Sequence, residues 1–209
     1  MEATTSTFSP PSHLIAEIDP PKGTNLDTFL DKALKIRGRV ARVRVTDNEH
    51  AILHMSPLAP CLALKEKGVE PSMVINGRDR NRLSFQGDLL CAATMGINDV
   101  VLKEGHDPKE GDQPMARTSG DLDLETMLTC VSSMNAGKDL AGEELDGGTN
   151  FNIGVYIELS DDVNFNRERA EYFLKLKDFG VQSVTLGPTY DLNNVEQYQP
   201  FAEQTGINL

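Results

Sequence analysis

Tryptophan is absent from the 209-residue sequence, and cysteine is scarce. The three cysteines, Cys61, Cys91 and Cys130, are odd in number and far apart, and they form no paired Cys motif. They therefore predict neither a disulfide framework nor a zinc site built on thiolates. Their pattern is typical of reduced thiols in the cytoplasm.

Basic side chains are in deficit. Lysine and arginine number 20 against 32 aspartate and glutamate residues, which gives a formal net charge of -12 and a pI near 4.7. Because an acidic surface repels phosphate backbones and anionic lipids, we expect no nucleic-acid partner and no membrane partner.

Long hydrophobic runs and the common nucleotide-binding motifs are also absent. No apolar run approaches the roughly 18 to 20 residues that span a bilayer, and the N-terminus lacks a basic region followed by a hydrophobic one. We therefore expect a soluble, cytoplasmic protein. No Gly-x-Gly-x-x-Gly or Walker sequence follows any apolar run, so the usual nucleotide-binding forms of an open α/β sheet are not supported.

Short apolar runs alternate with longer amphipathic stretches along one domain, 13–209, which follows a Ser/Thr/Pro-rich flexible arm at 1–12. Four glycines each end a helical pattern just before a strand, as a left-handed helix end requires: Gly38, Gly68, Gly96 and Gly180. The strand candidates are 13–18, 40–45, 72–76, 99–104, 152–159 and 183–186. The helical stretches begin near Asn25, Pro60, Asn81, Asp121, Asn166 and Asn193.

This repeated βα order predicts an α/β fold of the (β/α)₈ TIM-barrel type. About six units are present, and a seventh strand would begin at the final GINL, whereas a closed barrel takes about 250 residues. We therefore expect an incomplete barrel with unpaired edges at its first and sixth strands. An exposed apolar interior would then favour a homo-oligomer or a subunit of a complex.

Two loops are rich in glycine and acidic residues. Residues 105–120 follow the fourth strand, and residues 137–150 precede the fifth. Loops after strands form the catalytic face of a parallel barrel, so 105–120 is the functional candidate. The alternative is a solvated acidic surface loop.

Polar residues gather just past the strand ends, where a barrel would bring them to one mouth. Glu17 stands out because it lies within the apolar run LIAEI, where desolvation would raise its proton affinity as a general acid needs. The alternative is a structural ion pair with Arg78 or Arg80. The other strand-end candidates are Asp19, Thr46, Asp47, Asn48, Asn76 through Arg82, His106, Asp107, Glu158, Tyr190 and Asp191.

The run GRDRNR allows two interpretations. Arg78, Arg80 and Arg82 could bind an anionic ligand, but alternating charges at a helix start more often form a salt-bridged cap. Elsewhere, His13, His50 and His54 show no metal-ligand spacing with one another. No metal site is therefore predicted.

Two arginines in the second strand present a further problem. Arg42 and Arg44 share the parity of Thr46, so all three side chains should lie on one face. If Thr46 points into the mouth, two guanidinium groups lie deeper on that face, where an unpaired charge is costly. Their expected counter-charges are Asp19, Glu104 or Glu158, or else water enters an unclosed barrel.

Five motifs in order at βα spacing resemble the methylenetetrahydrofolate reductase family, which consists of flavin-dependent (β/α)₈ barrels that reduce methylenetetrahydrofolate to methyltetrahydrofolate. The resemblance runs from about Ile15 to the C-terminus. The motifs are Glu17-Ile18-Asp19-Pro20-Pro21, Val45-Thr46-Asp47, Arg78-Asp79-Arg80-Asn81, the loop 105–112 with Asp121-Leu122-Asp123 after it, and Pro188-Thr189-Tyr190-Asp191.

The resemblance implies specific roles at the mouth. Glu17 would protonate the folate as its iminium electrophile forms, and Asp107 would lie near both flavin and pterin as a second catalytic residue. The electron donor would be NAD(P)H or a partner protein. The residues implied to bind FAD are Thr46, Asn76, Gly77, Arg78, His106, Asp107, Lys175 and Lys177, and those implied to bind folate are Glu17, Asp107, Gly187 and Tyr190.

The sequence departs from the family pattern at several positions. The family's loop aspartate falls on His106, and its glutamine before Pro188 is Gly187 here. The lysine expected near the flavin phosphates falls on Leu176, although lysines flank it, and the family's last two strands lie beyond Leu209. We therefore expect FAD to bind weakly or not at all. The alternatives are a non-catalytic folate-binding or partner subunit and a flavin-free, pterin-binding methyltransferase-type barrel.

Overall fold

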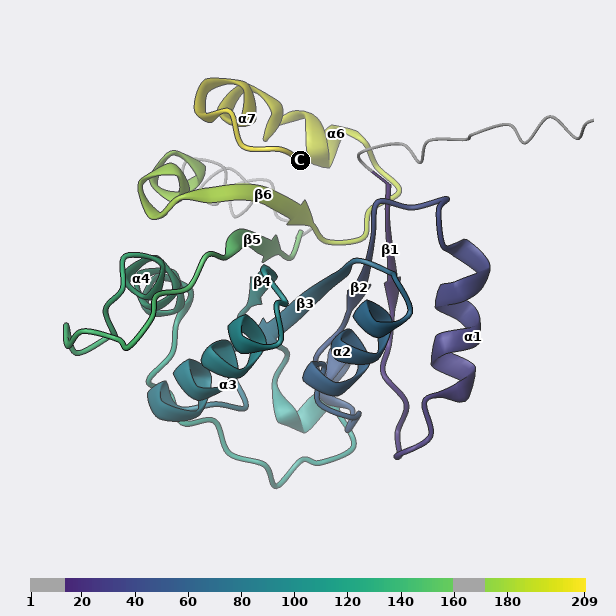
Figure 1. Cartoon of the computed structure of the whole chain (residues 1–209). Helices are drawn as coiled ribbons and strands as arrows, with labels where there is room; N and C mark the ends of the chain where they lie inside the picture. The colour runs from purple at the N-terminus through teal and green to yellow at the C-terminus, as the bar shows by residue number, and fades with distance from the viewer. Residues whose placement is uncertain (1–13, 160–171) are drawn as a thin grey trace, which may run out of the picture.

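The computed structural model describes residues 14–159 and 172–209 (Figure 1). The predicted flexible arm 1–12, His13 and the helix start near Asn166 lie outside the described residues. No helix within the described ranges is long and apolar enough to cross a membrane.

Six parallel strands form one sheet in the order of the sequence, which confirms the six predicted strands (Figure 1). Each strand pairs with the next one along the chain, as expected when helical segments connect parallel strands. The strands are β1 (Ile15–Ile18), β2 (Arg42–Val45), β3 (Pro71–Asn76), β4 (Asp99–Lys103), β5 (Asn152–Ile157) and β6 (Val181–Leu186).

Helical segments follow the strands, and the four predicted glycine ends all have positive φ. Asn81 caps its helix through a capping box, as predicted, whereas the next helix is capped by Asp123 and not by Asp121. The segments are α1 (Asp27–Ile36), η1 (Glu49–Ala51), α2 (Leu58–Glu66), α3 (Arg82–Thr94), η2 (Pro108–Glu110), α4 (Leu124–Asn135), η3 (Lys177–Phe179), α6 (Asn193–Glu196) and α7 (Gln199–Thr205).

The hydrophobic core lies between the sheet and the helices that cover its outer face. Alternate strand residues such as Val43, Val45, Met73 and Ile75 are buried in one cluster with apolar residues of the helices. Since side chains of a strand alternate between two faces, the residues between them project from the other, concave face.

The concave face carries charged and polar side chains beside the buried Val74 and Val101, so it is less apolar than expected. The Arg44 guanidinium donates from β2 to the Thr185 hydroxyl of β6 at 2.8 Å, although three strands separate them in the sheet. This contact shows that the sheet curls into a half-barrel, consistent with an incomplete TIM-like barrel. Self-association through this open interior stays a prediction.

The counter-charges of the two β2 arginines also differ from those expected. Arg42 pairs with Asp99 at 3.3 Å, and Arg44 lies 4.0 Å from Glu17. Neither arginine pairs with the expected Asp19, Glu104 or Glu158. Arg42 and Asp99 meet from different strands because the curl brings β2 and β4 side chains together on the concave face.

The edges of the sheet are β1 and β6 in the part of the chain that the structure describes. Leu14 and Ile15 at the β1 edge are exposed, as an open edge predicts. At the other edge, the Asn208 backbone pairs with β6 through a parallel bridge to Ser183. The final residues thus extend the sheet where a seventh strand was predicted to begin.

Candidate functional site

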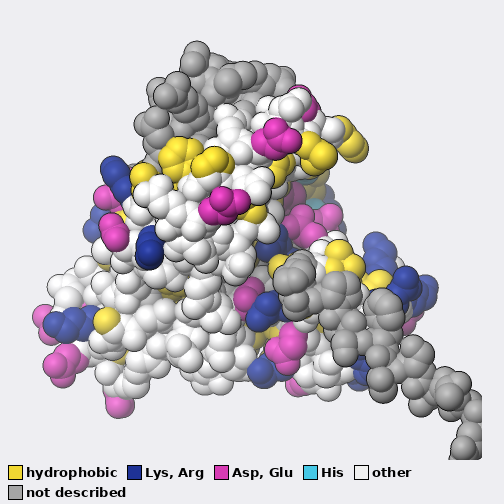
Figure 2. All heavy atoms as spheres, turned by 90° about the horizontal axis from the view of Figure 1, so that it is seen from above, with side chains coloured by type: hydrophobic (Ala, Val, Ile, Leu, Met, Phe, Trp, Pro, Cys, Tyr) yellow, Lys and Arg dark blue, Asp and Glu magenta, His cyan; other side chains and the backbone are white. Residues whose placement is uncertain are grey.

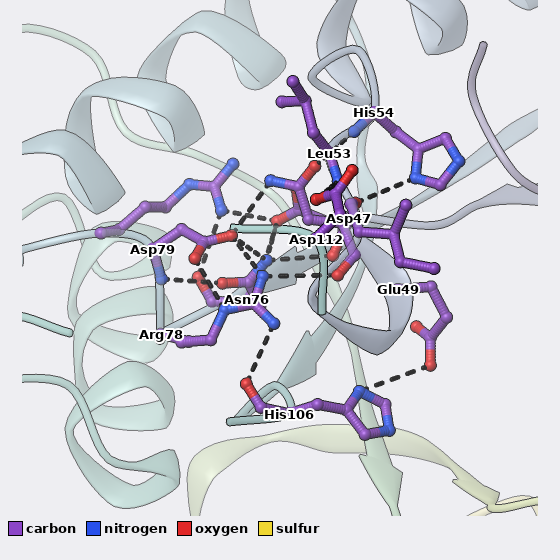
Figure 3. A network of polar contacts seen from close by, with 12 residues as sticks. Asp47, Glu49, Leu53, His54, Asn76, Arg78, Asp79, His106 and Asp112 are labelled. Atoms are coloured by element: carbon purple, nitrogen blue, oxygen red, sulfur yellow. Dashed lines mark hydrogen bonds and ion pairs between the residues drawn. The ribbon is translucent and has the colours of Figure 1, made fainter. Parts of the chain in front are cut away.

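The candidate site lies at the carboxyl ends of the strands, where the loops after β2, β3 and β4 meet (Figure 3). The centre of this region is the buried carboxylate of Asp47. It accepts hydrogen bonds from the Asn76 backbone at 2.9 Å and from the Asn76 side chain at 2.8 Å, and it pairs with Arg80 at 2.5 Å. Burial raises the pKa of Asp47, and the Arg80 guanidinium opposes that rise. The network holds the ends of β2 and β3 together.

Arg78 binds its neighbour Asp79 through two hydrogen bonds of 2.6 Å. The same guanidinium donates to the backbone oxygens of His106 and Asn48, so it connects the loops after three strands (Figure 3). Hydrogen bonds from Arg78 lower the pKa of Asp79, although its burial opposes this. Of the two interpretations of GRDRNR, the structure favours the salt-bridged one for Arg78 and Arg80.

A pocket of about 560 Å³ opens beside this network. Four residues implied to bind FAD line it, namely Gly77, Arg78, His106 and Asp107, together with much of the predicted functional loop. The lining side chains Lys109 and Arg117 add two cations. The sequence therefore identified a set of residues that the fold brings to one cavity.

The loop that forms the pocket rests directly on η1. Asp112 accepts a hydrogen bond from the Leu53 backbone at 2.9 Å, and its own amide donates to the Ala51 carbonyl at 3.3 Å. A Cβ atom at Gly111 would lie 1.9 Å from that carbonyl oxygen. Only glycine fits the backbone approach at this position.

Gly111→Ala is therefore expected to displace the pocket loop and to lower the free energy of unfolding by about 1–3 kcal/mol, as overpacking does. Urea denaturation gives the stability. Gly87→Ala in α3 is the matched control, since nothing lies within 4 Å of its added Cβ. Equal stability of the Gly111 variant and the wild type would contradict the close packing.

Glu17 lies at the edge of the concave face, with its side chain 44% exposed. Partial burial raises its pKa, nearby Glu49 and Asp19 act in the same direction, and Arg44 opposes the rise. The alternative structural pairing with Arg78 or Arg80 is wrong, because those arginines pair with aspartates of their own.

Sequence reasoning singled out His106 and Glu158 but missed three ionisable residues near them, Lys103, Glu49 and Tyr156. Lys103 Nζ lies 2.5 Å from Glu49 and 3.4 Å from Glu158, and it sits 4.1 Å from the centre of the Tyr156 ring. Burial raises the pKa of Tyr156 to about 12, and the nearby carboxylates add to the rise. One available signal was Lys103 itself, a charge inside the apolar run DVVLK, as Glu17 is inside LIAEI.

Two further residues implied to bind at the mouth already have partners within the chain. The Thr46 hydroxyl donates to Asp19 at 2.6 Å, and Asn76 uses its side-chain amide on Asp47 and Asp79. Asp107 is exposed and caps η2 by accepting from the Lys109 backbone.

The implied folate contacts after β6 lie in contrasting surroundings. Gly187 is buried, and its amide donates to the Ile157 carbonyl at 2.6 Å. Tyr190 is fully exposed. The structure thus packs the first against β5 and leaves the second in solvent.

The two lysines implied to hold flavin phosphates do not line the pocket. Lys175 sits 5.7 Å from the centre of the Tyr172 ring, and Lys177 begins η3, directly before β6. Because the segment before a parallel strand lies at its amino end, Lys177 is at the opposite end of β6 from the mouth. The fold does not bring them to the pocket.

Comparison with known proteins leaves the family open. No family model and no curated protein matches the sequence. Solved structures do match. One is the putative copper homeostasis protein CutC from Streptococcus agalactiae, at 17% identity over 93% of this chain and 95% of that chain, with a TM-score of 0.37. A likeness at this level carries no argument about function.

Charges of both signs are interspersed on the surface seen from above (Figure 2). Acidic side chains prevail over the whole chain, with 32 against 20 basic ones. This view shows no broad basic surface of the kind that binds phosphate backbones.

Proposed function

We propose that the chain is a reductase of the methylenetetrahydrofolate type built on an incomplete (β/α)₈ barrel, with FAD as cofactor and a folate as substrate. The observation that carries the proposal is Glu17, a carboxyl group with a raised pKa at the carboxyl end of β1. A carboxyl group that keeps its proton closer to neutral pH can act as a general acid.

In this proposal, Glu17 donates its proton to the folate nitrogen whose bond to the one-carbon unit opens to form the iminium. Arg44, 4.0 Å away, then stabilises the carboxylate that remains. A bound flavin would supply the hydride that reduces the iminium to the methyl group. The electron donor that restores the flavin is NAD(P)H or a partner protein, and we place the reaction in the cytoplasm.

Two cations of the pocket, other than those expected, support a phosphate-bearing cofactor, although Glu104 and Asp107 also line it. Lys109 and Arg117 line it from the loop after β4, and they would hold the phosphates. Arg78 is already bound to Asp79, and Lys175 and Lys177 lie elsewhere. We therefore expect weaker flavin binding than is usual in the family.

Arg78 and Asn76 are already hydrogen-bonded to aspartates of the chain, which makes them less available to a flavin. This favours a second candidate, a non-catalytic folate-binding subunit of an oligomer or complex.

One experiment distinguishes the reductase from the binding subunit. The full chain is mixed with reduced FAD under anaerobic conditions, and methylenetetrahydrofolate is added. The reductase oxidises the flavin and forms methyltetrahydrofolate. A binding subunit retains the folate in equilibrium dialysis and leaves the flavin reduced. If neither flavin oxidation nor folate retention is observed, both candidates are rejected.

A further inference from the structure

Three metal-ligating side chains converge at the mouth from two loops. Glu49 and His50 belong to η1 after β2, and His106 follows β4. One ligand atom from each lies within 4.8 Å of the other two. Ligands about 2 Å from a tetrahedral zinc ion lie roughly 3.3 Å apart, so small side-chain movements would close the site.

The orientation of His106 suits metal binding. Its Nε2 lies 3.0 Å from a Glu158 carboxylate oxygen, while its Nδ1 faces Glu49 at 3.8 Å (Figure 3). Histidines that bind metals commonly donate their second ring N–H to a carboxylate, which fixes the ring and its tautomer. Glu158 is placed to accept the N–H of Nε2. The Nδ1 atom of His106 then faces Glu49 and is available to bind a metal ion.

The second histidine is held in place by an unusual backbone. Asn48, His50 and Ala51 all have φ between 46° and 55°, in the left-handed region that non-glycine residues rarely adopt. The loop at Gly111 packs against this turn. The rings of His50 and His106 lie 4.7 Å apart. Such strain persists where the surrounding structure enforces it, commonly at functional sites.

Charge at the mouth also favours a cation. Glu17, Glu49 and Glu158 interact there with two cations, Lys103 and Arg44. The three carboxylates outnumber the two cations, so a divalent ion would enter a cluster with excess negative charge. Lys103 now pairs with Glu49, and the ion would compete for that carboxylate.

We infer that Glu49, His50 and His106 form a binding site for a divalent first-row transition-metal ion such as Zn²⁺, with Glu158 orienting His106. Two imidazoles and one carboxylate suit Zn²⁺ and leave a coordination position open for water or another ligand. This site differs from the expectation of no metal, which rested on spacing in the sequence. The inference does not depend on the proposed reductase activity.

The test is calorimetric titration of the metal-free full-length chain with Zn²⁺. We expect one Zn²⁺ per chain and at least a tenfold weaker affinity in His50→Gln and in His106→Gln. His54→Gln is the matched control, because His54 belongs to the same loop but its Nδ1 lies 3.0 Å from the Ile52 carbonyl and outside the cluster. Wild-type affinity in either cluster variant, an equal loss in the control, or no saturable binding would overturn the inference.

A second measurement does not depend on the folding of the histidine variants. Cys91 is the exposed thiol among the three free cysteines, so Cys91→Ser removes the main competing soft ligand. Co²⁺ bound to this variant should show ligand-field bands without a thiolate charge-transfer band. Loss of Co²⁺ binding in Cys91→Ser, or a thiolate band that persists, would place the metal elsewhere and reject the site.

Discussion

Glu17→Gln is expected to remove most of the turnover of methylenetetrahydrofolate, by about 100-fold or more, while flavin binding and the fold are retained. The amide keeps the shape and hydrogen bonding of the carboxyl group but cannot donate a carboxylic proton, and general acids contribute about 10²–10⁴ to a rate. The measurement is the rate at which methylenetetrahydrofolate oxidises reduced FAD in the presence of each protein.

The pH profile separates this role from a structural one. The raised pKa of Glu17 means that its protonated form persists to higher pH, and the wild-type rate should fall as pH rises through that pKa. The variant should lack this fall. Glu70→Gln, an exposed position directly before β3 at the amino end of the sheet, is the control. Near-full activity in Glu17→Gln would reassign Glu17 to the ion pair with Arg44.

If the wild-type chain shows no turnover, folate affinity becomes the readout. Weaker folate binding in Glu17→Gln would keep this residue at the ligand. Equal affinity in the variant and the wild type would favour the partner-subunit candidate and remove Glu17 from the site.

Asp47→Ala is expected to lower the free energy of unfolding by about 3–5 kcal/mol, as breaking a buried ion pair does. The Asp47 side chain is 2% exposed, and its removal takes the side-chain acceptor from the Asn76 backbone N–H and the more buried of two carboxylates from Arg80. Urea denaturation followed by circular dichroism gives the change.

Asp88→Ala supplies the matched comparison, because Asp88 is the second carboxylate on Arg80 but is 32% exposed. Solvent screens that pair, so its loss should lower stability by less than about 1 kcal/mol. A similar loss of stability in both variants would show that burial does not distinguish the two carboxylates of Arg80.

Much of the fold could be predicted from local patterns. Six apolar runs separated by helical stretches gave the six strands, and the left-handed glycines gave the helix ends at Gly38, Gly68, Gly96 and Gly180. These signals are readable because strand period, helix period and positive φ each depend on a few neighbouring residues. The start of α4 was less clear, since Asp121 and Asp123 both suit an N-cap and only the latter binds the helix amide.

The candidate site was predictable in part, for a similar reason. Gly77, Arg78, His106 and Asp107 all follow strands, and parallel topology brings such residues to one end of the sheet, where they line the same pocket. Lys175 shows the limit of that reasoning. The resemblance to the reductase family predicted that Lys175 contacts the flavin. Whether this side chain reaches the mouth depends on where its helix ends, which the resemblance did not determine.

The sequence by itself determined the order of the strands, their parallel direction and the gathering of loop residues at one mouth, because these follow from periodicity and connectivity along the chain. Only the tertiary structure decided which charges pair. Arg44 meets Glu17 and Thr185, and Glu49 approaches His106, across distances in sequence that no local pattern encodes. Those contacts depend on the curl of the sheet and on the loop packed at Gly111, which bring side chains from separate strands within a few ångströms.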